Sequence, residues 1–227
     1  MKNQYRFFLQ GDSFSKEEKH QIFNVLRLKI GDKITLVKEK KEFLATITKD
    51  GYNIIEEITE NREANVSLTL AIATLKKDKL EYIFQKATEI GVENFIIFNG
   101  ENSVKTIDQA SFEKTLPRYN KIITEASEQS LRLVCPQIKF TDLKNIDFSN
   151  FEKVLITDLE GTPLLQNLNK ENKNILLIIG PEGGLSQTEM DFIKAQGGET
   201  VSFGKRILRS ETAAMVISAC VINFYEL

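Results

Sequence analysis

The chain has 227 residues, of which 41% are hydrophobic and 27% are charged, with 30 Lys and Arg against 32 Asp and Glu. This length suits one large domain or two smaller ones, and ordinary apolar content with balanced charge excludes a wholly disordered chain. The formal net charge of −2 also excludes a strongly basic chain, so any contact with nucleic acid must depend on local patches.

The first seventy residues predict one helix followed by short strands. Ser15 and Glu18 have the spacing of a capping box at the start of that helix. An alternating apolar pattern then predicts strands over residues 34–37, 43–48 and 52–58. Several short strands in so small a span predict a compact β-barrel or sandwich. Because residues 60–63 are polar and break the pattern, we place a boundary there, which gives domains of residues 1–63 and 64–227.

From residue 64 onward, predicted strands and helices alternate. The strands cover residues 66–73, 95–98, 154–157, 175–179 and 200–203. The helices cover residues 78–90, 108–131, a stretch that starts at Ser186, and residues 211–224. This alternation predicts a mostly parallel sheet with helices on both faces. The last helix is apolar almost all round, so we expect it to be buried in a core or in a subunit interface.

Cysteine and histidine usage limits the cellular and metal chemistry. Cys135 and Cys220 are too few for a disulfide scaffold and predict free thiols in a reducing compartment. One His and two Cys do not suffice for a structural zinc site. The apolar runs are too short for a signal peptide or a membrane span. We therefore expect a cytoplasmic protein with no membrane segment and no metal.

In open α/β sheets, ligands bind beyond the carboxyl ends of the strands, where this sequence has three unusual loops. The first is Gly-Pro-Glu-Gly-Gly-Leu-Ser, residues 180–186, after a fully apolar strand. Its glycines allow close approach of a ligand to the backbone, although they would also serve a tight turn. The loop is neither a GxGxxG motif nor a P-loop. Because Glu182 would repel a phosphate, an uncharged or cationic ligand fits better.

The second loop, residues 203–213, carries three cations, Lys205, Arg206 and Arg209. It precedes a helix start that favours anions, so it could hold an RNA phosphate or a developing negative charge. Alternatively, Arg209 and Glu211 form a surface pair with no further role. The third loop, residues 157–163, is a weaker indication, because polar loops that end in proline are common.

Together these segments resemble the 16S ribosomal RNA uracil-N3-methyltransferase family, within the SPOUT superfamily of methyltransferases that use S-adenosyl-L-methionine (AdoMet). The resemblance covers nearly the whole chain. Its most specific parts are residues 179–186, Gly204 and residues 206–213. Further matching stretches are His20, residues 25–32, 79–81, 85–92 and 125–130, and Arg132.

The resemblance implies a PUA-like β-barrel that helps to bind rRNA, and an α/β domain whose C-terminal end is threaded into a deep trefoil knot. It implies a homodimer that methylates N3 of a uridine in 16S rRNA, within the assembled small ribosomal subunit. The implied cofactor, AdoMet, carries a sulfonium cation and no phosphate, which agrees with the acid in the first loop. The motif residues that would line its pocket are Gly180, Glu182, Gly183, Gly184, Phe203, Gly204 and Leu208. Thr157 and Asp158 are placed there by loop position alone.

Uracil N3 is a poor nucleophile until its proton is lost, so methylation needs a general base or stabilisation of the negative charge on O2 and O4. Arg209 is predicted for the electrostatic role. Glu211 is predicted either to orient that guanidinium or to act as the base. Arg132 is a candidate for contact with a phosphate or a base, and it completes the predicted catalytic set.

The predicted RNA contacts are His20, Arg27, Lys205 and Arg206. His20 is distant in sequence from the cofactor loops, so a structural or RNA-contact role is favoured over that of a base. The sequence departs from the family pattern at Gln21, Val134 and Lys205, where relatives often have histidine, arginine and proline. Residues 1–41 hold ten Lys and Arg against five Asp and Glu, so the balanced net charge conceals a basic N-terminal segment.

Two other functions remain open. One is a non-catalytic RNA- or ribosome-binding factor on a similar scaffold, and the intact loop of residues 180–184 weighs against it. The other is a nucleotide-dependent oxidoreductase. The absence of a GxGxxG motif and the presence of Glu182 weigh against that function.

Overall fold

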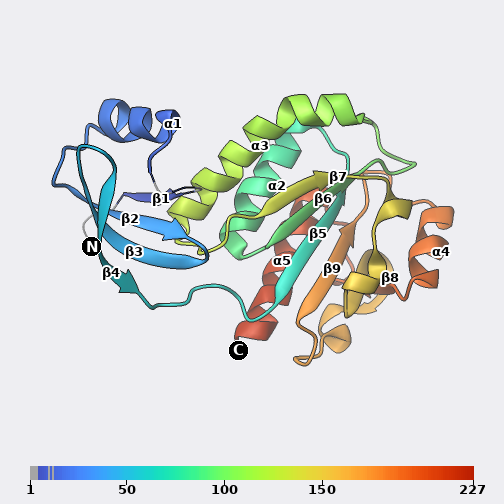
Figure 1. The fold of residues 1–227 in the computed structure, drawn as a ribbon. Helices are drawn as coiled ribbons and strands as arrows, with labels where there is room; N and C mark the ends of the chain where they lie inside the picture. Colours follow the sequence, from blue (N-terminus) through green and yellow to red (C-terminus); the bar gives the residue numbers. More distant parts are fainter. Residues whose placement is uncertain (1–4, 10, 12) are drawn as a thin grey trace. The chain divides into compact units, whose positions relative to one another are not determined.

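The computed structural model describes residues 5–9, 11 and 13–227, and the chain divides into two compact units (Figure 1). Unit 1 consists of Met1–Glu63 and Ser127–Cys135, and unit 2 consists of Ala64–Ala126 and Pro136–Leu227. The first stretch of unit 1 ends at the boundary predicted from the polar residues 60–63. That unit 1 also takes in residues 127–135 was not anticipated from the sequence.

Unit 1 is built on a four-stranded sheet in the order β1-β2-β3-β4. The strands are β1 (Arg6–Phe8), β2 (Lys33–Lys38), β3 (Lys41–Ile47) and β4 (Tyr52–Ile58). β1 runs parallel to β2, whereas the other neighbours are antiparallel. The three strands predicted for this region are confirmed. β1 was missed because its three residues, Arg-Phe-Phe, are too few to show an alternating pattern.

The single predicted helix of unit 1 is confirmed at its start. α1 (Lys16–Lys19) begins with the capping box of Ser15 and Glu18, and the chain continues as a π-helical segment, η1 (His20–Val25). Its buried Ile22 joins apolar side chains of the strands in one core. That core consists of Phe7, Leu9, Phe14, Ile22, Ile34, Leu36, Ala45 and Ile47.

A buried ion-pair network holds the two stretches of unit 1 together. Glu42 accepts hydrogen bonds from Arg6 and, at 2.7 Å, from Arg62. Arg6 also donates to the main-chain carbonyl of Arg132, and Arg132 Nε donates to the two carboxylate oxygens of Glu63 at 2.8 and 3.0 Å. The side chains of Arg6, Glu42 and Arg132 are 3%, 5% and 4% exposed, so these charges are stable only because each is paired.

Unit 2 is built on a six-stranded sheet whose neighbouring strands are all parallel, in the order β10-β8-β9-β5-β6-β7. The strands are β5 (Ser67–Ala73), β6 (Asn94–Phe98), β7 (Gln137–Phe140), β8 (Lys153–Pro163), β9 (Asn174–Ile179) and β10 (Glu199–Ser202). The predicted parallel sheet is confirmed. β7 was not predicted, because its sequence Gln-Ile-Lys-Phe is short and only half apolar.

Helices cover both faces of this sheet, as predicted (Figure 1). They are α2 (Lys77–Ile90), α3 (Gln109–Gln129), α4 (Gln187–Ala195) and α5 (Ser210–Glu226), with short 3₁₀ segments η2 (Leu143–Asn145), η3 (Phe148–Asn150) and η4 (Leu164–Asn167). On one face, Met190 and Ile193 of α4 belong to the same buried apolar cluster as Ala71 and Ile178. On the other face, α5 packs on α2, β5 and β9. In the part of the chain that the structure describes, no helix is long and apolar enough to cross a membrane.

β8 is longer than predicted because two separate parts of it pair with β10. Thr200 pairs with Ile156, whereas the next residue, Val201, pairs with Thr162. The intervening residues of β8 therefore leave the regular ladder. Gly161 makes the second contact possible, because a Cβ there would lie 2.6 Å from the backbone of Val201. The residues just after Ile156 are thereby directed out of the sheet.

We expect Glu42→Gln to destabilise unit 1 by about 3 kcal/mol, because it leaves the buried Arg6 guanidinium without its counter-charge. The free energy of unfolding in urea, followed by a probe in unit 1, measures this loss. Glu57→Gln is the matched control, since Glu57 forms an exposed ion pair with Lys41 on the same sheet. Equal stability losses in the two variants would contradict the importance of the buried network.

Candidate functional site

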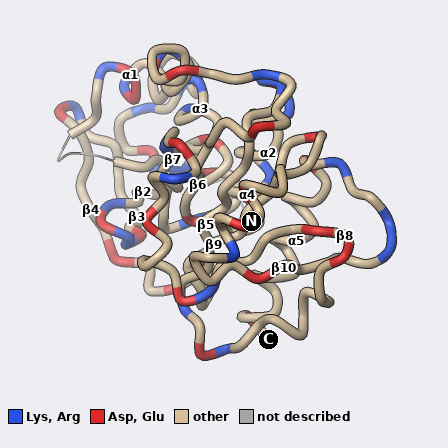
Figure 2. The backbone as a smooth tube through the Cα atoms, turned by 90° about the vertical axis from the view of Figure 1, so that its right-hand side faces the viewer, with Lys and Arg blue, Asp and Glu red and all other residues tan. Residues whose placement is uncertain are grey.

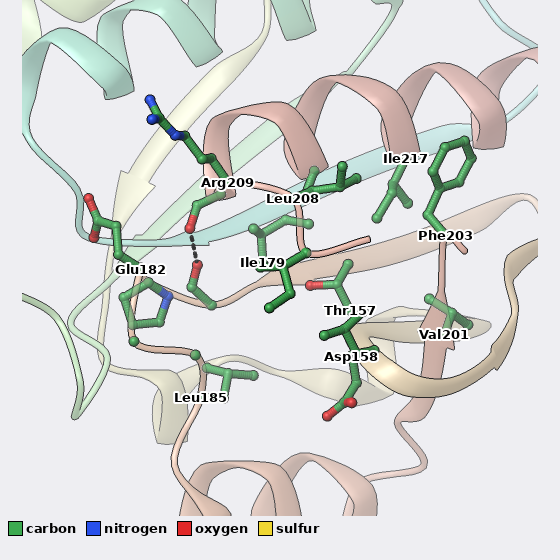
Figure 3. A pocket seen from close by; sticks show the side chains of 18 of the residues that line it. Thr157, Asp158, Ile179, Glu182, Leu185, Val201, Phe203, Leu208, Arg209 and Ile217 are labelled. Atoms are coloured by element: carbon green, nitrogen blue, oxygen red, sulfur yellow. Dashed lines mark hydrogen bonds between the residues drawn. The ribbon is translucent and has the colours of Figure 1, made fainter. Parts of the chain in front are cut away.

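Unit 2 contains a pocket of about 570 Å³ where three segments meet (Figure 3). They are residues 157–159 of β8, the loop 179–185 after β9, and residues 203–210 between β10 and α5. All three follow the paired part of a strand, which is where ligands bind in open α/β sheets. The volume is that of a site for a small molecule.

The nine residues predicted to bind the cofactor all line this pocket. They are Thr157, Asp158, Gly180, Glu182, Gly183, Gly184, Phe203, Gly204 and Leu208. The three loops singled out in the sequence are thus brought together by the fold. Their individual roles in binding the cofactor stay predictions.

The glycine-rich loop is shaped by steric limits as well as by its cap. Ser186 and Glu189 form the predicted capping box, which fixes the end of the loop at the start of α4. A Cβ on Gly180 would lie 2.9 Å from the backbone nitrogen of Leu185, closer than real Cβ contacts allow. Gly184 has a φ of +73°, in the left-handed region that favours glycine. The glycines are therefore required by the turn itself.

A second loop supports the glycine-rich loop from outside the pocket. Asn102 Nδ2 donates a hydrogen bond to the carbonyl of Gly184 at 3.2 Å, and a Cβ on Gly183 would lie 3.0 Å from Asn102 Cβ. Asn102 was not predicted to have a role. It is 82 residues from Gly184 in the chain, so no local pattern indicated the contact.

One end of the pocket is charged. Lys79, in the first turn of α2, lines the pocket and donates a hydrogen bond to Glu182 Oε1 at 2.9 Å. Its Nζ also lies 3.3 Å from Glu211 Oε2, in the first turn of α5. The hydrogen bond from Lys79 lowers the pKa of the Glu182 carboxyl, and the same bond raises the pKa of Lys79. Three separate elements are therefore joined by one ammonium group.

Lys79 was missed as a site residue. It belongs to a stretch that resembles the family, residues 79–81, but a lysine at the start of a charged helix has the usual pattern of a solvated surface. Only the fold brings it to the two carboxylates. The pairing also corrects the alternative in which Glu211 forms a surface pair with Arg209, because the structure pairs Glu211 with Lys79.

Arg209 lies at the same end of the pocket as Glu182, away from Phe203 and Ile217 at the other end (Figure 3). It is the N-cap residue of α5, and the neighbouring Ser210 Oγ donates to the carbonyl of Gly180 at 3.0 Å. Its own side chain is exposed. Among residues 5–9, 11 and 13–227, none forms an ion pair with the Arg209 guanidinium, so that guanidinium is available to a ligand.

The other end and the body of the pocket are apolar. Ile179, Leu208 and Ile217 cluster there with Val201 and the aromatic ring of Phe203 (Figure 3). Apolar walls with a few placed polar groups are typical of ligand pockets. The pocket can therefore hold a flat apolar group at one end and a charged or polar group at the other.

The remaining predicted residues lie outside this pocket, with one exception. Arg206, predicted to contact RNA, lines the pocket, whereas Lys205 is not among its lining residues. His20 and Arg27 are exposed in unit 1. Arg132, predicted as a catalytic residue, lies in unit 1, where its buried side chain binds Glu63. The fold does not bring it into the pocket, and its catalytic role stays a prediction.

Within the part of the chain that is described, no group of three or more His, Cys, Asp or Glu residues could hold a metal ion. The charged side chains that line the pocket are those of Lys79, Asp158, Glu182, Arg206 and Arg209, and Glu211 lies next to it as a partner of Lys79.

Comparison with known proteins gives two family matches along the chain. The profile of an RNA methyltransferase domain matches residues 62–222, and that of an RNA methyltransferase PUA domain matches residues 14–56. The first match includes every residue that lines the pocket. The second falls within the first stretch of unit 1.

Individual relatives match over nearly their whole length. Ribosomal RNA small subunit methyltransferase E of Bacillus subtilis is 35% identical over 95% of this chain and 91% of its own. The protein of the same name from Mesomycoplasma hyopneumoniae is 32% identical over 96% and 99%. Among solved structures, ribosomal RNA small subunit methyltransferase E from Neisseria gonorrhoeae, bound to S-adenosyl methionine, matches with a TM-score of 0.86 and 26% identity over 98% of both chains.

We expect Lys79→Met to raise the pKa of Glu182 towards its ordinary value, because the hydrogen bond that lowers it is lost. A carboxyl with a lowered pKa stabilises the fold above its unfolded-state pKa, and that stabilisation is lost as the pH falls through the folded-state pKa. The stability difference between the variant and the wild type should therefore shrink on acidification.

Titration of the glutamate carboxyl carbons by NMR, together with unfolding at several pH values, measures both effects. Lys86→Met is the matched control, because Lys86 lies on the same helix and pairs with Glu89 at 2.8 Å. An unchanged pKa of Glu182 in Lys79→Met would show that the ion pair is not formed in solution.

Proposed function

This chain belongs to the ribosomal RNA small subunit methyltransferase E family of RNA methyltransferases, and we propose that it transfers the methyl group of AdoMet to N3 of a uridine in 16S rRNA. The observation that carries this proposal is the meeting of three loops, distant in sequence, in one pocket whose lining matches the family motifs. The resemblance of those motifs to uracil-N3-methyltransferases supports the choice of base and atom.

The pocket fits AdoMet in both shape and charge. Its apolar body, with Ile179, Leu208 and Phe203, suits an adenine ring, and the glycine backbone allows close approach. Two carboxylates, those of Asp158 and Glu182, line the pocket and tolerate a ligand with a cationic centre, and Glu182 is also paired with Lys79. When bound, AdoMet supplies an electrophilic methyl group attached to a positively charged sulfur.

Arg209 is the residue we assign to stabilising charge on the uracil. For methyl transfer, the N3 proton of uracil would pass to solvent or to a nearby carboxylate, and N3 would form a bond to the methyl carbon as the electron pair of the carbon–sulfur bond went to sulfur. Loss of the proton places negative charge on O2 and O4. A guanidinium beside those oxygens lowers the free energy of that anion. The pairing of Glu211 with Lys79 supports a role for Glu211 in arranging the charged end of the pocket.

Contacts with rRNA are proposed for basic residues in both units. Exposed His20 and Arg27 in unit 1, and Lys205 and Arg206 beside the pocket, carry positive charge or hydrogen-bond donors for phosphates. Figure 2 shows Lys and Arg distributed along the backbone among Asp and Glu, so the attraction is local. The match of residues 14–56 to an RNA methyltransferase PUA domain supports RNA binding by unit 1.

We also infer the trefoil knot implied by the family. The segment that connects β8 to β9 contacts β10 through η4, and η4 also contacts α5. Near the end of the chain, Tyr225 Oη donates to the carbonyl of Asn169 at 2.6 Å. The segment between β8 and β9 therefore contacts both β10 and α5, near the C-terminal end of the chain. Such contacts are expected if the chain end passes through the loop that this segment forms. Because most protein chains are unknotted, a knot has to be inferred from specific contacts. The contacts of η4 and of Tyr225 are the ones that support it here.

A homodimer is proposed from the surface of α5. Several of its apolar side chains are only partly buried within one chain, and they are Met215, Val216, Ala219, Cys220 and Phe224. Apolar groups that recur along one helix and stay partly exposed favour contact with another protein surface. We place the dimer in the cytoplasm, acting on 16S rRNA in the assembled small ribosomal subunit.

The function is tested by incubating the protein with AdoMet carrying a labelled methyl group and with unmodified small ribosomal subunits. We expect labelled 3-methyluridine after digestion of the rRNA. Label on another base or atom would refute the proposed substrate. Absence of both AdoMet binding and methyl transfer would favour a non-catalytic factor, and binding of NADH in place of AdoMet would favour an oxidoreductase.

Arg209→Met should lower kcat by about 100-fold or more, as expected for loss of a group that stabilises developing charge. AdoMet affinity, measured by calorimetry, should change little, because the apolar body and the glycine loop remain intact. Gly180→Ala provides the contrast, since its Cβ would collide with the backbone of Leu185 and should weaken AdoMet binding. Loss of AdoMet binding in Arg209→Met would refute the role assigned to Arg209.

A further inference from the structure

The charged end of the pocket contains a lysine to which the reaction above assigns no role. Lys79 comes from α2, Glu182 from the loop after β9, and Glu211 from α5. The ammonium lies 2.9 Å from one carboxylate and 3.3 Å from the other. All three side chains are largely shielded, with exposures of 22%, 31% and 18%. Charges so placed are screened by solvent less than surface charges are.

Arg209 lies beside this cluster without belonging to it. Its position in the chain is two residues before Glu211, and its guanidinium is at the same end of the pocket as Glu182 (Figure 3). In the described part of the chain it makes no ion pair, whereas both nearby carboxylates are engaged by Lys79. Because Lys79 already compensates the charge of Glu182 and Glu211, these carboxylates attract the Arg209 guanidinium less strongly than they would alone.

We propose that Lys79 is a positioning residue that occupies the carboxylates of Glu182 and Glu211 and so keeps the Arg209 guanidinium available to the substrate. Without Lys79, Glu211 loses its ion-pair partner and Glu182 keeps only the longer-range attraction of Lys76, so the two carboxylates draw Arg209 towards them. The guanidinium is then drawn away from the uracil oxygens. This inference rests on the role of Arg209 in the proposed function, and it explains why a lysine stands between two acids in the wall of the pocket.

Two other roles of Lys79 make different predictions. If Lys79 itself touched the substrate, its loss would lower turnover whether or not the two acids were present. If it only fastened α2 to the neighbouring loops, its loss would weaken AdoMet binding and stability together with turnover. If Lys79 is a positioning residue, its loss lowers turnover only when Arg209 and the carboxylates of Glu182 and Glu211 are present.

The first measurement compares kcat, KM and AdoMet affinity in the full-length protein acting on small ribosomal subunits. Lys79→Met should lower kcat by about tenfold while AdoMet affinity changes by less than about threefold. Lys79→Arg, which retains a cation between the acids, should recover most of the turnover. Lys86→Met, on the same helix but outside the pocket, should behave as the wild type.

A double-mutant cycle then separates the three roles. In an E182Q background, and again in an E211Q background, Lys79→Met should lower kcat by a smaller factor than in the wild type, falling to about twofold when both acids are replaced. In an R209M background it should have no further effect. The same tenfold loss in every background would overturn the proposal and indicate direct contact between Lys79 and the substrate.

A readout independent of turnover is the Nε–H resonance of Arg209 in the NMR spectrum of the free protein. Lys79→Met should shift this resonance and slow its exchange with water, because the guanidinium enters an ion pair, and E182Q/E211Q should reverse both effects. An unchanged resonance would overturn the inference. Failure of the wild type to methylate small subunits would instead refute the proposed function, while the NMR result would still test the capture of Arg209.

Discussion

Two separate parts of β8 pair with one short strand, β10, and the positions of two of the three pocket segments depend on that pairing. Since Ile156 and Thr162 both lie against β10, the residues between them are forced out of the sheet, which places Thr157 and Asp158 in the pocket wall. The same pairing sets where β10 ends and where the segment 203–210 begins. The loop after β9 lies beside these two segments. Three segments that are well separated in sequence thus meet in one pocket.

The two units handle charge in different ways. In unit 1, Glu42 and Arg6 are almost fully buried, and their pairing compensates for lost hydration. In unit 2, the charges of Lys79, Glu182 and Glu211 border a pocket and stay partly accessible. The first arrangement is suited to holding chain segments in place. The second keeps a polar end next to an apolar body, which is what a cofactor with a cationic centre and an aromatic ring requires.

Local signals in the sequence predicted the local structure well. The capping boxes at Ser15 and Ser186 and the apolar run of β9 depend only on neighbouring residues, and all three are found in the fold. The glycine loop was identifiable because its composition is unusual for any turn. β1 and β7 were missed because strands of three and four residues gain their stability from partners far along the chain. Lys79 and Arg132 have ordinary sequence contexts, so their roles could not be predicted from neighbouring residues. Contacts with residues far along the chain show that Lys79 lies in the pocket and that Arg132 is bound to Glu63.

The anchoring of residues 127–135 in unit 1 has a consequence for how the protein can be divided. The backbone passes between the units three times, after residues 63, 126 and 135. Unit 1 is therefore not a separate N-terminal domain joined to the rest by a single linker. A fragment cut at residue 63 would separate Glu63 from Arg132 and leave the backbone amides of Leu133 and Val134 without their acceptor. Exchange of the N-terminal unit between relatives, whether by recombination or in the laboratory, must therefore carry residues 127–135 along with the N-terminal strands.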